Sequence, residues 1–160
     1  MKKGFVFILL LISLSAVKVF GDDGMRIKID NYEITVPSGW MAQRIDSATV
    51  FMLYSPIEEN DDFQENANLA VEKLPTKYTV KKYLETGREA LKIVYGDFKL
   101  IEEGKNYHII SGNINGILVT QIQFVEMKGN EAYVLTFTSN PNNFNRYLEI
   151  FKTIYKSFKY

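Results

Sequence analysis

The chain of 160 residues contains no cysteine and only one histidine. Without cysteine, the protein has no disulfide framework, thiolate zinc site, cysteine nucleophile or lipid-modified cysteine. A single histidine also excludes metal sites built from several histidines. The 19 basic side chains are balanced by 19 acidic ones, so no net charge attracts nucleic acid. We therefore expect no nucleic-acid partner.

Glycine and proline are also scarce, with 10 and 4 residues, whereas hydrophobic residues make up 46% of the chain. This composition excludes collagen-like and disordered chains and is typical of one globular domain.

The chain has no glycine-rich phosphate loop, nucleophile elbow or zinc-binding His-Glu-x-x-His helix. His108 alternates with Ile110 on a predicted strand, which favours a structural imidazole, and Ser111 falls on the opposite strand face. We expect neither a catalytic dyad nor a cofactor.

The N-terminal segment has the pattern of an export signal. Lys2 and Lys3 precede an apolar run over residues 5–14. A membrane-spanning helix needs about 20 apolar residues, and Lys18 interrupts the run before that length is reached. A cleaved signal is therefore favoured over an uncleaved anchor.

Val19 and Gly21 fit the −3 and −1 positions of a cleavage site before Asp22. We predict a signal peptide at 1–21 and a single domain at 22–160. Cleavage removes three lysines and leaves a mildly acidic protein without a stable membrane anchor. The expected location is the periplasm or the outside of the cell.

Alternation of apolar and polar residues predicts strands over most of the mature chain. Asp30-Asn31 and Asn115-Gly116 fall between such segments and are typical hairpin turns. The predicted strands are 26–29, 32–36, 41–45, 49–54, 67–74, 99–103, 107–112, 116–127 and 131–139.

Two segments, 80–94 and 144–158, carry apolar residues at helical spacing. Gly87 lies on the apolar stripe of the first segment, where glycine costs about 1 kcal/mol relative to alanine. We therefore expect this helix to pass close to the sheet. For the second helix we predict Asn140 as the cap and Pro141 in the first turn. Because strands occur in consecutive runs, the pattern predicts an α+β fold with a mainly antiparallel sheet.

Several short motifs occur in an order that resembles the PsbP-like superfamily. They are Tyr32-x-Ile34-x-Val36-Pro37-x-Gly39-Trp40, the aromatic strand 51–56, Asn66-x-Asn68-Leu69-x-Val71, Tyr133-x-Leu135-Thr136 and Ile154-x-x-Ser157-Phe158-Lys159. This superfamily includes the extrinsic protein of photosystem II, the Mog-type Ran-binding protein and exported bacterial proteins of unassigned role. The resemblance is to the exported bacterial branch. It implies an α/β/α sandwich with helices on both faces of a central antiparallel sheet, and a binding or assembly-assisting role.

An acidic loop is the segment whose side chains most suggest a function. Its carboxylates are Glu58, Glu59, Asp61, Asp62 and Glu65, with Phe63 among them. A solvated loop is the simplest interpretation, because like charges repel. A docking loop for a basic partner would use Glu58, Glu59, Asp61, Asp62 and Phe63. A weak calcium-type site would use Asp61, Asp62 and Glu65, although the spacing and central glycine of an EF-hand are missing.

Pro37, Gly39 and Trp40 are typical of a corner between strands that is closed by an aromatic ring, with a ligand-stacking tryptophan as the alternative. The sequence thus predicts an exported, non-catalytic binding or assembly-accessory protein of the cell envelope. Its expected partner is a protein or a small ligand. The alternative is an extracytoplasmic enzyme, such as a hydrolase, with an unrecognised site.

Overall fold

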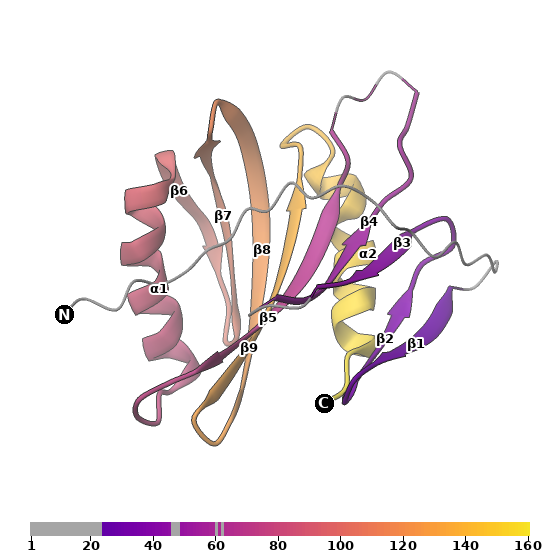
Figure 1. The fold of residues 1–160 in the computed structure, drawn as a ribbon. Helices are drawn as coiled ribbons and strands as arrows, with labels where there is room; N and C mark the ends of the chain where they lie inside the picture. The colour runs from indigo at the N-terminus through magenta and orange to yellow at the C-terminus, as the bar shows by residue number, and fades with distance from the viewer. Residues whose placement is uncertain (1–23, 46–48, 60, 62) are drawn as a thin grey trace.

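The computed structural model describes residues 24–45, 49–59, 61 and 63–160, which form nine strands and two helices (Figure 1). The strands are β1 (Met25–Ile29), β2 (Tyr32–Val36), β3 (Met41–Arg44), β4 (Thr49–Tyr54), β5 (Asn66–Lys73), β6 (Gly96–Glu103), β7 (Tyr107–Ile114), β8 (Ile117–Lys128) and β9 (Glu131–Ser139). The helices are α1 (Val80–Val94) and α2 (Phe144–Ser157). The predicted signal peptide lies outside the described residues.

Seven strands form one antiparallel sheet in the order β3-β4-β5-β9-β8-β7-β6, while β1 and β2 pair separately (Figure 1). Asp30, with a φ of 53°, turns the chain between β1 and β2, and Asn115 and Gly116 do the same between β7 and β8. Short polar side chains and glycine tolerate this left-handed backbone conformation. The predicted hairpins and antiparallel sheet are confirmed.

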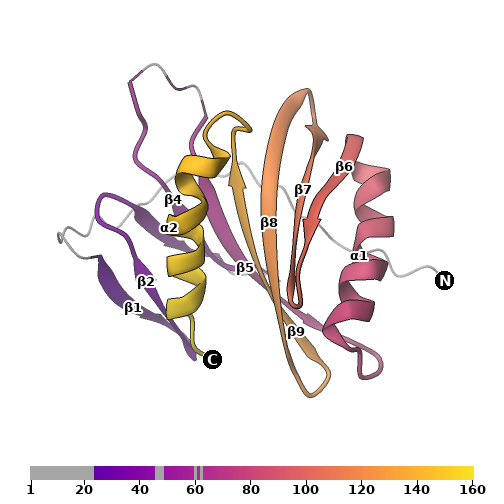
Figure 2. The same cartoon turned by 180° about the vertical axis from the view of Figure 1, so that it is seen from behind.

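The two helices cover opposite faces of the large sheet (Figures 1 and 2). Strand β9 shows the division, because successive side chains of a strand point to opposite faces. Leu135 and Phe137 belong to the apolar cluster that contains Phe151 of α2. Val134 instead packs in a cluster with Leu84 of α1. The structure is therefore the α/β/α sandwich that the sequence resemblance implied.

Helix α1 contacts the sheet through two separate apolar clusters, one containing Leu84 and the other Leu91. Gly87 lies between them and is buried. A Cβ atom at Gly87 would meet nothing within 4 Å apart from the helix's own backbone. The expectation that Gly87 allows a close approach to the sheet is therefore wrong.

Helix α2 begins later than predicted. Its N-cap is Asn143, and the first helical residue is Phe144. Asn140 forms a turn of its own, because its side-chain oxygen accepts from the Asn142 N–H at 2.9 Å and its carbonyl accepts from the Asn143 N–H at 3.0 Å. Pro141 therefore lies in this turn, and Asn140 does not cap the helix.

Candidate functional site

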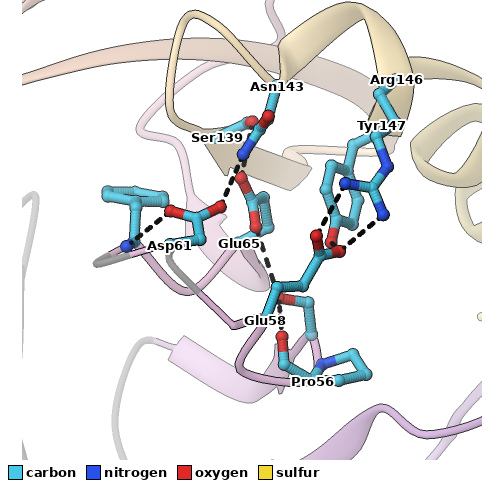
Figure 3. Close-up of polar contacts among 10 residues, drawn as sticks. Pro56, Glu58, Asp61, Glu65, Ser139, Asn143, Arg146 and Tyr147 are labelled. Atoms are coloured by element: carbon cyan, nitrogen blue, oxygen red, sulfur yellow. Dashed lines mark hydrogen bonds and ion pairs between the residues drawn. The ribbon is translucent and has the colours of Figure 1, made fainter.

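The acidic loop is held against the start of α2 (Figure 3). Arg146 donates two hydrogen bonds to the carboxylate of Glu58, at 2.7 and 2.8 Å, and the Tyr147 hydroxyl donates a third at 2.6 Å. The bonds from Tyr147 and Arg146 hold the pKa of Glu58 below its ordinary value. Burial, followed by the bond to Glu58, raises the pKa of Tyr147 to about 12. Glu58 is thus committed to contacts within the chain.

Asp61 and Glu65 are also bonded internally (Figure 3). Asp61 accepts from the Phe63 N–H at 2.9 Å and from the Asn143 side-chain amide at 2.6 Å. Glu65 is only 1% exposed and accepts from the Ser139 hydroxyl at 3.0 Å. Phe63 is half-buried against the apolar cluster at the end of α1. The loop therefore connects the two helical layers of the sandwich.

Glu59 is exposed, and Asp62 lies outside the described residues. Within the described ranges, no three histidine or acidic side chains are grouped so that they could hold a metal ion. The structure brings Glu58 and Asp61 together against α2 but points Glu65 into the interior. The weak metal site and the docking loop remain hypotheses drawn from the sequence.

A network of buried polar side chains lies on the sheet face beneath α1. The Tyr95 hydroxyl donates to Gln121 Oε1 at 2.5 Å, and Gln121 Nε2 donates to the Thr138 hydroxyl at 2.8 Å. Gln123 Nε2 also donates to Gln121 Oε1, at 3.4 Å. Gln123 therefore turns its oxygen toward His108 Nε2, 2.9 Å away, so this nitrogen carries the proton.

His108 is 1% exposed, and its Nδ1 has no hydrogen-bond partner among the described residues. Arg88 Nη1 of α1 is also buried without a hydrogen bond, although it forms an ion pair with Glu103 Oε1 at 3.1 Å. Burial is the main cause that lowers the pKa of His108, and the nearby Arg88 charge acts in the same direction. The expectation of a structural imidazole is confirmed, because His108 is enclosed and bonded to Gln123.

An apolar cleft of about 320 Å³, here called the Trp40 cleft, opens between β1 and β3. Met25, Ile27 and Ile29 form one wall, since alternate residues of β1 share a face. Trp40 and Ala42 contribute to the opposite wall. The full lining is Met25, Ile27, Lys28, Ile29, Val36, Pro37, Ser38, Trp40, Ala42 and Arg44. The cleft lies where the edges of the two sheets face each other.

Arg44 follows Ala42 by two residues and therefore extends from the same face of β3. Its Nη2 lies 3.3 Å from Asp30 Oδ1, in the turn between β1 and β2. The side chains of Arg44 and Asp30 are 61% and 47% exposed. This solvated ion pair links the two sheets at one end of the cleft.

Trp40 belongs to the core as well as to the cleft wall. It is 4% exposed, and its ring contacts Tyr147 and Phe151 edge-on, with centroid distances of 6.2 and 6.4 Å. The backbone N–H of Trp40 donates to the Pro37 carbonyl at 3.1 Å, which closes the predicted corner. The sequence identified Trp40 as a candidate, but only the approach of β1 to β3 in space reveals the cleft. The apolar residues that alternate at positions 25, 27 and 29 were the local pattern that could have indicated the β1 wall of the cleft.

No protein-family model matches the chain, and no curated protein sequence matches it significantly. Solved structures do match. Cyanobacterial PsbP (CyanoP) from Synechocystis sp. PCC 6803 is 16% identical, with 93% of this chain and 98% of that chain covered at a TM-score of 0.57. The fold is PsbP-like. This finding confirms the resemblance that the motifs suggested.

Two further structures share the architecture. LpqN of Mycobacterium tuberculosis, described as involved in cell envelope biogenesis, is 16% identical over 91% of this chain and 90% of LpqN, with a TM-score of 0.54. A protein from Bacteroides thetaiotaomicron VPI-5482 is 15% identical over 87% of this chain, at a TM-score of 0.50. The match spans 48% of that protein.

Proposed function

We propose that the protein is an exported, non-catalytic binding module of the cell envelope and that the Trp40 cleft is its binding site. The observation that carries this proposal is the cleft itself, which has apolar walls on two strands. Small-molecule sites are typically concave and mostly apolar, with few polar groups. Among the described residues that line the cleft there is no carboxylate and no histidine.

The positions of the titratable groups support binding over catalysis. Acid-base or nucleophilic catalysis needs such groups to converge on one accessible pocket. His108 and Glu65 are each 1% exposed and are bonded inside the fold, away from the cleft lining. Ser38 supplies a hydroxyl to the lining, without an acid or a histidine beside it there.

Two observations support the envelope as the compartment. The sequence begins with the pattern of an export signal, and LpqN, which has the same fold, is involved in cell envelope biogenesis in its own organism. No helix in the described part of the chain is long and apolar enough to cross a membrane. We infer that the protein acts as a binding or assembly accessory after export.

Binding to the cleft is tested with prodan, a neutral apolar fluorophore, and with the emission of Trp40, the sole tryptophan. Prodan should bind the purified protein and change both signals. Ala42→Leu fills the cleft and should abolish binding, whereas Ala90→Leu adds the same bulk to another half-buried alanine and should not. Circular dichroism confirms that both variants fold. Equal binding by the Ala42→Leu variant would show that the cleft is not the site.

The remaining parts of the proposal have their own tests. N-terminal sequencing of protein recovered from the host should begin at or near Asp22. Recovery from membranes of a protein that keeps Met1 and resists alkaline extraction would contradict export by cleavage. Hydrolysis of a chromogenic ester that is lost on Ser38→Ala would contradict the non-catalytic assignment and favour the hydrolase alternative.

A further inference from the structure

We propose that β6 is a docking edge at which two copies of the chain pair in antiparallel orientation and join their large sheets into one. The edge is separate from the Trp40 cleft, because β6 and β3 form the opposite edges of the sheet (Figure 1). The dimer therefore leaves both clefts free.

The backbone of β6 is open on its outer side. β6 is the last strand of the sheet and pairs only with β7. In the described part of the chain, no backbone hydrogen bond outside the ladder with β7 involves residues 97–103. The N–H and C=O groups of such an edge can pair with a strand of another chain, which is a recurrent mode of protein association.

The cover that α1 provides ends before this edge. Ile110 of β7 is fully buried in the apolar cluster that contains Leu91 of α1. Leu100 is the partner of Ile110 on β6 and therefore lies on the same face of the sheet. It is nevertheless 44% exposed. The face of β6 beside Leu100 is thus open to a second chain.

Exposed apolar side chains gather around the edge. Leu100 and Ile101 lie next to each other in β6, and Ile101 is 59% exposed. Four more apolar residues, all over half exposed, flank the start of β6 at the end of α1 and beside the turn between β7 and β8: Ile93, Val94, Ile117 and Leu118. Groups of exposed apolar residues mark interaction surfaces in soluble proteins.

The charges along the edge favour a second copy as the partner. Asp97, Lys99, Glu102 and Lys105 are exposed and alternate in sign. Glu103 is already paired with an arginine of α1. In reverse order the signs are inverted, so two antiparallel copies bring opposite charges together. Parallel copies would place like charges side by side, which is unfavourable. A two-fold axis between identical subunits produces the antiparallel arrangement.

Lys99 and Glu102 form the central complementary pair. Lys99 lies opposite Ser111 and Glu102 opposite Ile109, which share one face of β7. A register shift, with one extra residue in β6, therefore puts both charged side chains on the same face. Glu102 accepts a hydrogen bond from a tyrosine hydroxyl, which is neutral and leaves the negative charge in place. A lysine on an edge strand discourages unrelated strands, so Lys99 selects a partner that supplies a carboxylate.

Sedimentation of the purified protein tests the pairing. We expect a dimer with a dissociation constant on the order of micromolar, because one strand pair buries less area than a standard interface. Lys99→Glu and Glu102→Lys should each weaken the dimer by about tenfold or more, since like charges then face each other. An equimolar mixture of the two variants should associate more tightly than either variant alone, because every facing pair has opposite signs. A folding defect in one variant does not explain such recovery.

Ile101→Lys should also abolish the dimer, whereas Ile57→Lys, at an apolar residue that is 78% exposed in another part of the chain, should not. Circular dichroism confirms that the variants fold, and prodan binding should be the same in all of them. Dimers of undiminished affinity in Lys99→Glu and Ile101→Lys would place the contact elsewhere and overturn the proposal. A protein that remains monomeric at about 1 mM would also overturn it. Binding to phosphatidylglycerol vesicles that Ile101→Lys abolishes, without self-association, would assign the edge to a membrane instead.

Discussion

Ser139 at the end of β9 donates a 3.0 Å hydrogen bond to Glu65, 74 residues away in the sequence. Both side chains are buried, with exposures of 0% and 1%. The hydroxyl of Ser55, also fully buried, approaches the same carboxylate at 3.5 Å. Glu65 therefore ties the end of the acidic loop to the central sheet, beside the start of α2.

Removing the Ser139 hydroxyl should destabilise the fold because it leaves a buried carboxylate short of a donor. We expect Ser139→Ala to lower the free energy of unfolding by about 1–3 kcal/mol, the usual cost for a buried group that loses a bond. Urea denaturation measures the change. The exposed Ser38→Ala serves as the control and should stay within about 0.5 kcal/mol. Equal values for the two variants would show that the Ser139–Glu65 bond is not needed.

Phe151 of α2 is fully buried among the rings of Trp40, Phe137, Phe144 and Tyr147. Its truncation to alanine leaves a cavity and should destabilise the domain by roughly 3–5 kcal/mol. Ile93→Ala removes an apolar side chain that is 87% exposed and should have almost no effect. A loss below about 1 kcal/mol for Phe151→Ala in denaturant would contradict the central role of α2 in the core.

Gly87 and Gly116 both have open space around a hypothetical Cβ atom, but their backbones differ. Gly87 is helical, so Gly87→Ala should stabilise the protein by up to about 1 kcal/mol through helix propensity. Gly116 has a φ of 87°, so Gly116→Ala should destabilise it through backbone strain. Thermal unfolding should shift in opposite directions. A lower melting temperature for Gly87→Ala would indicate that the space beneath α1 is needed.

Calcium binding by the acidic loop should be weak because the carboxylates of Glu58, Asp61 and Glu65 already accept internal hydrogen bonds. Arg146 is bound to Glu58, Asn143 to Asp61 and Ser139 to Glu65. A calcium ion needs six to eight oxygens, so we expect dissociation constants on the order of millimolar. Calorimetry measures them. Micromolar affinity that is abolished by the double change Asp61→Asn and Asp62→Asn would contradict this expectation.

Local patterns predicted the fold well because each element has its own periodicity. Alternation identified the strands, and the stripe around Phe151 identified α2. The start of α2 was misplaced because Asn140 has the chemistry of a cap but uses its oxygen in a separate turn. Asn140 and Asn143 could each precede the helix by residue type. The turn at Asn140 leaves Asn143 as the N-cap.

The candidate sites were less predictable because they depend on contacts between distant residues. Glu58 appears as one charge in an acidic run, and nothing nearby indicates that Arg146 neutralises it. The Trp40 cleft requires the edges of β1 and β3 to face each other, which no residue pattern encodes. The open space at Gly87 likewise depends on how α1 lies against the sheet.

His108 provides the sharpest test of the polar network beneath α1. Arg88 on α1 and Glu103 on β6 are the charged groups that act on it, and Gln123 on β8 holds its Nε2. Burial lowers the pKa of His108 in the folded protein, whereas the unfolded chain keeps a value near 6.5. The imidazole is therefore neutral in the fold at a pH where the unfolded chain already binds a proton.

The free energy of unfolding should be at its full value above about pH 6.5 and should fall as the pH decreases below it, because only the unfolded chain takes up the proton. The decline should be no steeper than about 1.4 kcal/mol per pH unit, the limit for one proton, and should level off below the lowered pKa. Urea denaturation between pH 7.5 and 5 measures it. His108→Gln, which cannot titrate, should remove this part of the pH dependence, since the chain has no other histidine. An unchanged slope in that variant would show that the imidazole is not held neutral by the fold.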